Sequence, residues 1–367
     1  MYIHAVGFVF TQVMDILCLK SIYDQYAKNK SVNIFIYIFP RREEGFTTDE
    51  IVNKLDELCL PYRILDRNTV SNDKLDILFT CNPYIHKIYT SLYYSGIKLV
   101  YIPYGSSISG EKYSLDIQYQ KPIHKLAWKI YILNKFYEKF YITDGRRNNN
   151  IVVINTAPKF DSVLHEVPQQ TSITNAKVFL WNIHYSASMF FEKYQDGGDR
   201  KWSSFATYID VLYSIFRQRH DLKLFIRPHP DLFRERSFFL SVLDVFSDCN
   251  NVEIDDSTKN TFIASFQKSD VLITDLSSMM MDFLITGKPI ISLFNDNSCF
   301  LNEFAESLYG IYTYQVRNES ALQYIIKSLA AGKDPLFAER AKLVQSQGPF
   351  NLSKTAAELI VEDILSS

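Results

Sequence analysis

Cysteine is scarce in this sequence. Only five occur in 367 residues, and no two of them form a CxxC pair (Cys18, Cys59, Cys81, Cys249 and Cys299). An odd number of scattered cysteines argues against a disulfide framework and against a zinc site, and it fits a reducing compartment. Several stand in apolar runs, where a thiol serves as a small buried apolar group.

Segments that target or span membranes are also missing. The N-terminus has no basic region followed by a small-residue cleavage site, and no apolar run approaches the ~20 residues that a spanning helix needs. We therefore expect a cytoplasmic protein, with peripheral contact at the inner face of the cell membrane left open.

Neither sign of charge dominates the chain. The 39 Lys and Arg residues nearly balance the 41 Asp and Glu residues, for a net charge of −2. Such a chain has no global positive field to attract nucleic acid, so we expect no nucleic-acid partner. Any recognition of phosphate has to be local.

Several catalytic signatures are absent. The sequence has no GxxxxGK[ST], GxGxxG, HExxH or GxSxG, and no DxD-type metal pair beyond the adjacent Asp255 and Asp256. ATPase, dehydrogenase, zinc protease and α/β-hydrolase functions lose their main support. We expect no metal site and no resident cofactor.

The sequence does contain a regular alternation of strand-like and helix-like segments. Hydrophobic residues make up 47% and charged ones 22%, which is typical of a packed globular protein. The pattern predicts α/β layers with mainly parallel sheets. We expect strands at 2–10, 32–39, 74–80, 97–103, 139–143, 150–155, 177–183, 222–228, 251–255, 269–274 and 288–294. We expect helices around 11–29, 48–59, 83–95 and 122–138, and a helical tail over 318–366.

The second half repeats the layout of the first. The segment 157–175 between them carries Pro and polar residues that suit a linker. We predict two Rossmann-like domains facing a cleft, over 1–160 and 175–350, followed by a C-terminal helix over 351–367. In such sheets ligands bind beyond the carboxyl ends of the strands, so the residues that directly follow strands are the candidates for function.

The stretch LFIRPHPD places Arg227 and His229 after a strand. The guanidinium of Arg227 suits phosphate, and His229 can donate to a phosphate oxygen or move a proton. Pro228 and Pro230 restrict the backbone of the turn. The alternative is a stiff turn in which Arg227 pairs with an acid such as Asp231.

The stretch LITDLSS, residues 272–278, stands between a strand and a helix. A helix N-terminus offers unpaired N–H groups and partial positive charge, which favour phosphate, and Ser277 and Ser278 add hydroxyl donors. The alternative is that Thr274, Asp275 or Ser277 merely caps the helix. Asp282 lies among apolar neighbours, so we expect it to have a specific partner, either structural or a ligand hydroxyl.

Other strand ends offer weaker candidates. His184 follows a strand in LWNIHYS, and the loop over 185–205 has the length of a flexible lid. Ser257 and Thr258 are candidate helix caps. In the first half, Tyr104 and Glu111 belong to a polar loop over 103–112 that either faces the cleft or forms a surface turn.

Residues 121–147 combine lysines and arginines, among them Arg146 and Arg147, with many aromatics. This composition suits contact with an anionic membrane surface or acceptor. The favoured alternative is an ordinary amphipathic helix.

Taken together and in order, four pieces resemble one known family. They are NTAPKFD, LWNIHYS, LFIRPHP and SDVLITDLSSMMMDFLITGKPIISL, and they cover about residues 155–300. This order is similar to the CDP-glycerol glycerophosphotransferase family, which includes teichoic-acid primases and polymerases and their capsule-synthesis relatives. The N-terminal half resembles the family only loosely.

The resemblance implies a GT-B fold in which the N-terminal domain takes the acceptor and the C-terminal domain binds a CDP-activated donor. It implies transfer of a polyol phosphate, most simply glycerol phosphate, to a hydroxyl of a cell-surface glycan or its lipid-linked precursor, with release of CMP. His229 would stabilise charge on the leaving CMP, supported by Arg227. Thr274, Asp275, Ser277, Ser278 and Asp282 would hold the donor.

The sequence departs from the family at one motif. Polymerases carry a histidine in a motif of the type WHGTPLK, whereas this chain has Tyr104 before Gly105. Tyrosine is a poor base at neutral pH without help. The candidate bases are therefore Tyr104, Glu111 and His184, and a GT-B glycosyltransferase that uses a nucleotide sugar remains the alternative function.

Overall fold

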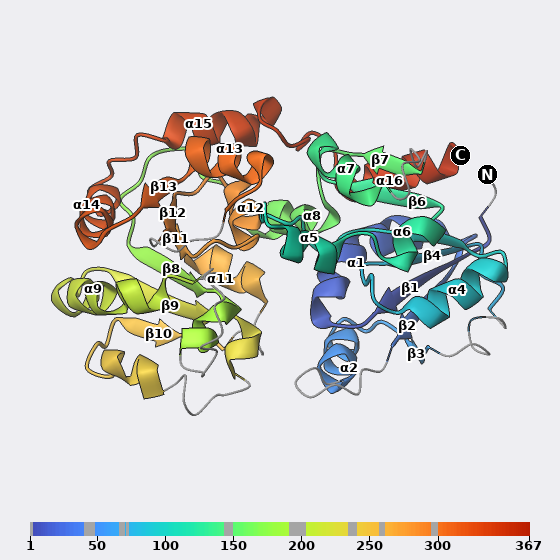
Figure 1. The fold of residues 1–367 in the computed structure, drawn as a ribbon, viewed down its shortest axis with the longest axis horizontal. Coiled ribbons are helices and arrows are strands. Elements are labelled where there is room, and N and C mark those ends of the chain that lie inside the picture. The colour runs from blue at the N-terminus through green and yellow to red at the C-terminus, as the bar shows by residue number, and fades with distance from the viewer. Residues whose placement is uncertain are drawn as a thin grey trace. The chain divides into compact units, whose positions relative to one another are not determined.

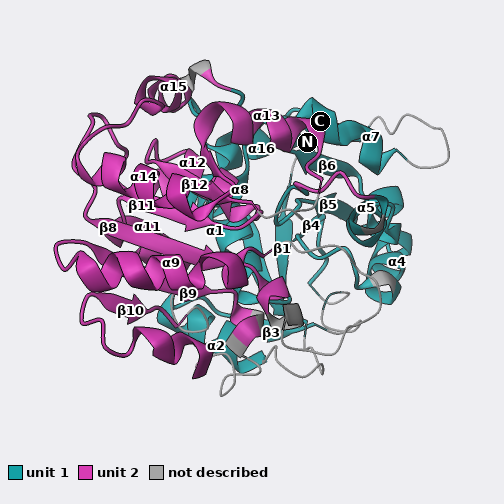
Figure 2. Ribbon diagram, turned by 60° about the vertical axis from the view of Figure 1, so that its left-hand side comes forward, with its two compact units in different colours: residues 1–107, 112–162, 349–367 teal, residues 108–111, 163–348 magenta. Residues whose placement is uncertain are grey.

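The structure, a computed structural model, describes residues 3–39, 48–65, 70, 73–142, 150–190, 203–233, 241–256, 261–294 and 300–367. Ser257, Thr258, Arg146, Arg147 and most of the predicted lid loop lie outside these ranges, as does Cys299. The chain divides into two compact units, coloured separately in Figure 2. Unit 1 comprises residues 1–107, 112–162 and 349–367, and unit 2 comprises residues 108–111 and 163–348.

Unit 1 is built on a parallel sheet with the strand order β3-β2-β1-β4-β5-β6-β7 among the described residues (Figure 1). Central strands such as β1 are buried on both faces, which explains their nearly continuous apolar sequences. The strand bounds are β1 Ala5–Phe10, β2 Asn33–Ile38, β3 Arg63–Ile64, β4 Ile77–Thr80, β5 Lys98–Tyr101, β6 Lys129–Ile132 and β7 Ile151–Val153.

Unit 2 has a second parallel sheet, ordered β10-β9-β8-β11-β12-β13 in the part that the structure describes. Its strands are β8 Val178–Ile183, β9 Lys223–Pro228, β10 Val252–Ile254, β11 Val271–Thr274, β12 Ile290–Leu293 and β13 Tyr314–Val316. Its apolar core gathers around Trp181 of β8. The predicted pair of Rossmann-like α/β domains is confirmed.

Helices connect the strands of both sheets (Figure 1). In the first half they are α1 Val13–Ala27, α2 Thr48–Glu57, α4 His86–Tyr94, α5 Lys112–Gln118, α6 Pro122–Leu126, α7 Glu138–Tyr141 and α8 Pro158–Glu166. In the second half they are α9 Phe205–Gln218, α11 Phe262–Lys268, α12 Met279–Leu284, α13 Glu303–Tyr312, α14 Glu319–Ala330, α15 Phe337–Lys342 and α16 Ala356–Leu365. None of the helices within the described ranges is both long and apolar enough to cross a bilayer.

Helix α16 belongs to the core of unit 1, although it ends the chain. Its Ala356, Ile360 and Ile364 are buried, and the helix packs against α1 in the apolar core that also contains the residues of β1. The carboxylate of Asp161 accepts bonds from the backbone N–H groups of Ala356, at 2.8 Å, and Ala357, at 3.0 Å, where α16 begins. These bonds satisfy donors that a helix N-terminus leaves open.

Two element predictions are wrong. The expected helix 122–138 is instead α6 followed by strand β6, and the expected strand 139–143 begins in helix α7. The expected linker 157–175 contains α8, and the division between the two units, after residue 162, falls within it. Strand β6 forms because its neighbours β5 and β7 supply backbone partners on both sides, which local periodicity does not reveal.

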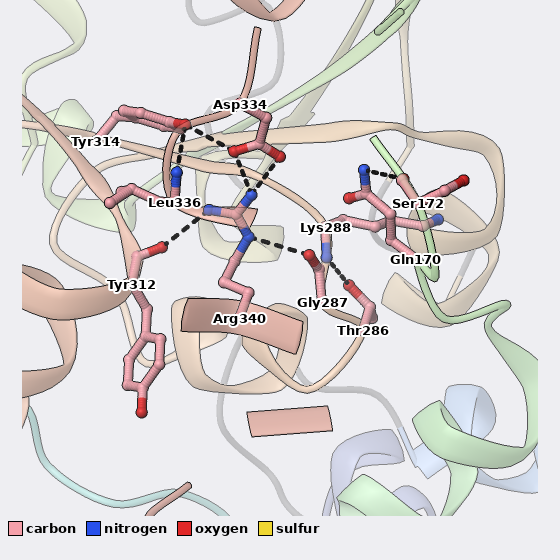
Figure 3. Close-up of polar contacts among 10 residues, drawn as sticks. All are labelled: Gln170, Ser172, Thr286, Gly287, Lys288, Tyr312, Tyr314, Asp334, Leu336 and Arg340. Carbon is pink, nitrogen blue, oxygen red and sulfur yellow. Dashed lines mark hydrogen bonds and ion pairs between the residues drawn. The ribbon is translucent and has the colours of Figure 1, made fainter. Parts of the chain in front are cut away.

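Unit 2 contains a buried ion pair between Asp334 and Arg340 (Figure 3). On α15, Arg340 donates to both carboxylate oxygens of Asp334, and its Nε donates to the carbonyl of Gly287 at 3.0 Å. The hydroxyl of Tyr314 donates to Asp334 at 2.7 Å. The cluster thereby ties the turn after α12 to β13 and α15.

Candidate functional site

The direction of winding in unit 2 changes between β8 and β11, and crevices at such points are where doubly wound sheets bind ligands. The strand register sets Asn182 opposite Thr274 on one side and opposite Arg227 on the other. The predicted residues His184, His229 and Asp275 directly follow these strands. Topology therefore gathers them at one edge of one sheet.

Asp275 connects the elements at this edge. Its buried carboxylate accepts the backbone N–H of His184 at 3.0 Å, the hydroxyl of Ser203 at 2.7 Å and the backbone N–H of Ser204 at 2.8 Å. Burial raises the pKa of Asp275 to about 6, against the lowering effect of these three bonds. Asp275 thus joins β8, β11 and the start of α9, and its contact with a donor stays a prediction.

Thr274 is also completely buried, and its hydroxyl donates to the side-chain oxygen of Asn182 at 3.3 Å. Its side chain holds β11 against β8 at the switch point. Its contact with a donor stays a prediction, and a side chain without exposed surface has to move before it can touch a ligand.

The imidazole of His184 is fixed in one tautomer. Its Nδ1 accepts the backbone N–H of Ser186 at 3.2 Å and lies 2.9 Å from the Ser186 hydroxyl. Because a backbone N–H can only donate, Nδ1 is unprotonated and the neutral ring carries its proton on Nε2. Burial, together with the charge of His229, lowers the pKa of His184 to about 3. The Nε2–H of His184 is therefore a hydrogen-bond donor at neutral pH, and the low pKa makes this ring a weak base.

His229 is half-buried, and its backbone is firmly held. Its N–H donates to the carbonyl of Ile183 at 2.9 Å, and its own carbonyl accepts from Leu232 at 2.9 Å. Its ring meets the ring of Tyr185 edge-on, with centroids 5.6 Å apart, and Tyr185 lies 4.3 Å from the ring of His184. Tyr185 therefore connects the two histidines, a link that the sequence analysis missed.

Arg227 pairs with an acid inside unit 2. Its side chain is buried, and Nη1 donates to Asp255 at 2.7 Å and to the hydroxyl of Ser265 at 3.1 Å. The alternative of an acid partner is thus observed with Asp255, while the side chain of Asp231 lies outside the described residues. Arg227 thereby braces the strand that carries His229. In the sequence, Asp255 could have been noticed as a partner because it stands at the end of an expected strand, and in the structure it directly follows β10.

The stretch Leu276-Ser277-Ser278 leads into α12, which is only six residues long. The hydroxyl of Ser277 accepts the N–H of Met279 at 3.3 Å, so this serine has the capping role considered as an alternative. Ser278 stands at the N-cap without a side-chain capping bond, and both serines are half-buried. Asp282 lies further along α12 and is buried.

Tyr309 of α13 holds the same turn from outside the predicted motif. Its hydroxyl donates to the carbonyl of Ser277 at 3.2 Å and lies 3.1 Å from the N–H of Ser277 as an acceptor. Local sequence patterns do not reveal this contact, because Tyr309 is 32 residues away from Ser277.

The two base candidates of the first half fall in different units. Tyr104 follows β5 in unit 1, and its carbonyl accepts from the thiol of Cys18 at 3.8 Å. Glu111 belongs to unit 2, where the segment 108–111 forms a bridge between Ser109 and Leu301. Within the described ranges, no group of three or more His, Cys, Asp or Glu side chains is arranged to hold a metal ion.

Residues 190–307 match the family model described as CDP-Glycerol:Poly(glycerophosphate) glycerophosphotransferase. The match confirms the predicted resemblance over that part of the chain, which includes Arg227, His229 and the Thr274–Asp282 stretch. No curated protein matches the sequence at a significant level.

Solved structures resemble the chain over its whole length at low identity. A candidate UDP-N-acetylglucosamine 2-epimerase from Listeria monocytogenes has a TM-score of 0.69 at 13% identity and covers 100% of this chain and 96% of its own. UDP-GlcNAc 2-epimerase from Neisseria meningitidis, bound to UDP-GlcNAc, has a TM-score of 0.66 at 12% identity, covering 99% and 100%. UDP-GlcNAc 2-epimerase from Methanocaldococcus jannaschii, with UDP-GlcNAc and UDP, has a TM-score of 0.64 at 13% identity, covering 99% and 100%. The predicted GT-B fold is confirmed by these similarities.

Proposed function

We propose that this protein transfers a polyol phosphate, glycerol phosphate first, from a CDP-activated donor to a hydroxyl of a cell-surface glycan or its lipid-linked precursor, releasing CMP. The observation that carries the proposal is the family match over residues 190–307. The switch-point edge of unit 2 lies partly within that stretch, so matched residues stand where doubly wound sheets bind ligands.

In the proposed reaction the acceptor oxygen attacks the phosphorus that bears the polyol. The bond between that phosphorus and the bridging oxygen breaks, CMP leaves with the electron pair, and the hydroxyl proton passes to a base. Phosphoryl transfer of this kind depends on positioning and on stabilisation of charge. His229 and the Nε2–H of His184 would donate to the diphosphate, with Ser277 and Ser278 as further contacts.

Arg227 and Asp275 would act through other residues in this scheme. Arg227 braces β9 through Asp255, and Asp275 fixes the backbone of His184. Tyr104 and Glu111 remain the proposed bases for the acceptor hydroxyl. Asp282 remains a proposed donor contact, and we retain peripheral contact with the inner membrane face as part of the proposal.

A GT-B glycosyltransferase that uses a nucleotide sugar is the second candidate. The solved structures that resemble the chain favour it, since their names refer to UDP-GlcNAc enzymes. Their identity to this chain, 12% and 13%, supports a shared fold and leaves the substrate open.

The two functions are separated by one panel of donors. The protein is incubated with CDP-glycerol, CDP-ribitol, CMP-sugars or UDP-sugars and candidate acceptors, and released CMP, CDP or UDP is measured. We expect acceptor-dependent release of CMP with a CDP-polyol. Activity with a UDP-sugar alone would rule out the first proposal and support the second.

His229→Gln is the matching test of the site. We expect kcat with CDP-glycerol to fall by about 100-fold or more, since one transition-state donor contributes on that scale. The control is His220→Gln, an exposed histidine between α9 and β9, which should leave kcat unchanged. Undiminished turnover in His229→Gln would show that this residue has no role in the chemistry.

A further inference from the structure

Two exposed tyrosines follow neighbouring strands of unit 1. Tyr84 comes after β4 and Tyr104 after β5, and these parallel strands are in register, with Thr80 opposite Tyr101. Tyr84 is 40% exposed and Tyr104 is 36% exposed. Both therefore stand at the carboxyl edge of the sheet, where ligands of such folds bind.

The backbone of helix α5 holds the tip of Tyr84. The hydroxyl of Tyr84 donates to the carbonyl of Ile117 on α5 at 3.4 Å, and Ile117 is 42% exposed. We call Tyr84, Tyr104 and Ile117 the tyrosine patch.

The backbone beneath Tyr84 is held by a buried chain of hydrogen bonds. The N–H of Tyr84 donates to the side-chain oxygen of Asn82 at 2.6 Å, and the amide of Asn82 donates to the hydroxyl of Thr11 at 2.9 Å. That hydroxyl donates in turn to the carboxylate of Asp15 at 2.7 Å. The chain links β4 to β1, the two strands at which the winding of unit 1 reverses.

The loop after Tyr104 is held in the same manner. The hydroxyl of Tyr137 donates to the carbonyl of Ser107 at 3.0 Å, and the N–H of Ser107 donates to the hydroxyl of Tyr119 at 3.4 Å. Both sides of the patch thus stand on backbone that is ordered before any ligand arrives, which lowers the entropic cost of binding.

We propose that the tyrosine patch binds a sugar ring of the acceptor by stacking. The inference rests on the proposed function and specifies its acceptor. A sugar ring presents an apolar face of C–H groups inside a rim of hydroxyls, and a tyrosine matches this with an apolar ring and a polar tip. A flexible glycerol phosphate chain has no such face and is better met by cationic side chains.

The test is direct binding by the full-length protein without any donor. Methyl glycosides of glucose, galactose and N-acetylglucosamine, and a glycerol phosphate trimer, are titrated by ligand-observed saturation-transfer NMR. We expect at least one glycoside to bind the wild type. Its Kd should rise about tenfold in Tyr84→Ala and Tyr104→Ala, because aromatic stacking contributes on that scale. The phenylalanine variants, which keep the ring, should stay within about threefold.

The control is Tyr94→Ala. Tyr94 ends α4 of the same unit, is 80% exposed, and lies at the amino end of β5, away from the patch. It should bind the glycosides as the wild type does. If an alanine variant fails to fold, the leucine variant at the same position removes the aromatic face while keeping apolar volume.

Two results would overturn the inference. One is a wild type that binds no glycoside or only the glycerol phosphate trimer, and the other is a glycoside Kd that is unchanged in the alanine and leucine variants. Its failure is distinct from failure of the proposed function. CDP-glycerol turnover with an unchanged acceptor KM in Tyr84→Ala refutes only the patch, whereas glycoside binding at the patch without turnover of any CDP-polyol refutes only the proposed reaction.

Discussion

Replacing Asp275 with asparagine removes a buried charge from the carboxyl edge of the unit 2 sheet while keeping the shape of the side chain. Burial moves the pKa of this carboxyl from 3.8 to about 6. The folded protein therefore binds a proton at higher pH than the unfolded chain does. The unfolding free energy is free of the charge penalty below about pH 4, and it falls as the pH rises through 6.

The magnitude follows from the shift. About two pKa units correspond to about 3 kcal/mol, and the uncharged asparagine does not titrate. The difference in unfolding free energy between wild type and Asp275→Asn should therefore change by about 3 kcal/mol between pH 4 and pH 7, in favour of the variant at the higher pH. The depressed pKa of His184 affects both proteins, so its contribution largely cancels in the difference.

Urea unfolding followed by tryptophan fluorescence measures this difference. Trp181 is fully buried in the unit 2 core and stacks on Phe205 with centroids 5.3 Å apart, so its emission reports on this unit. A free-energy difference that stays constant within about 1 kcal/mol from pH 4 to pH 7 would refute the assigned titration.

If the proposed function holds, the same variant has a catalytic consequence. Asparagine offers one acceptor oxygen to three donors, so we expect the backbone of His184 to loosen and kcat with CDP-glycerol to fall about tenfold or more. Asp270→Asn is the matched control, because Asp270 bridges the opposite end of β11 to the N–H groups of Lys177 and Val178. It should alter stability while leaving kcat of the folded protein near that of the wild type.

Other variants test the remaining contacts. Arg340→Met leaves Asp334 buried without its cation and should lower the free energy of unfolding in urea by about 3–5 kcal/mol. A decrease of less than about 1 kcal/mol would show that the ion pair does not stabilise the contacts among α15, β13 and the turn after α12. His184→Gln, which keeps an N–H donor, should retain more kcat/KM for CDP-glycerol than His184→Phe, and long-range ¹H–¹⁵N spectra should show the Nε2–H tautomer at pH 7; equal losses and a protonated ring would contradict the donor role. Arg227→Lys and Asp255→Asn should both lower kcat, because each loosens β9 in the same way. The kcat of the double variant should therefore fall much less than the product of the two single decreases. Independent decreases in kcat would argue for direct contact of Arg227 with the donor.

The strands at the centre of each sheet could be predicted from the sequence because they are buried on both faces. β9 and β11 carry runs of apolar residues bounded by turns, and this is a local property. β3 was missed because it is two residues long and exposed. β6 was predicted as helix because its conformation depends on long-range contacts. One of them is the hydrogen bond at 2.7 Å from the Tyr131 hydroxyl to Asp363, which is 232 residues further along the chain.

For the candidate site as well, one part could be predicted from the sequence and another could not. Its location at the ends of β8, β9 and β11 follows from strand prediction and the rule for doubly wound sheets. The hydrogen-bond partners of its residues could not be predicted, because they come from distant segments. Arg227 pairs with Asp255, and Asp275 accepts from Ser203. The tautomer of His184 likewise depends on the backbone conformation at Ser186, which composition and spacing leave undetermined.

The return of α16 to unit 1 bears on how the chain folds as it is synthesised. Residues 1–162 leave the ribosome before unit 2 and α16, yet their core stays open on the α1 side until residues 356–364 have been made. Unit 2 lies between these segments, so it can finish folding while unit 1 still exposes apolar surface. Exposed apolar surface makes the growing chain prone to aggregation during that interval. A chaperone that covers the surface later buried by Ile360 and Ile364 would reduce this risk.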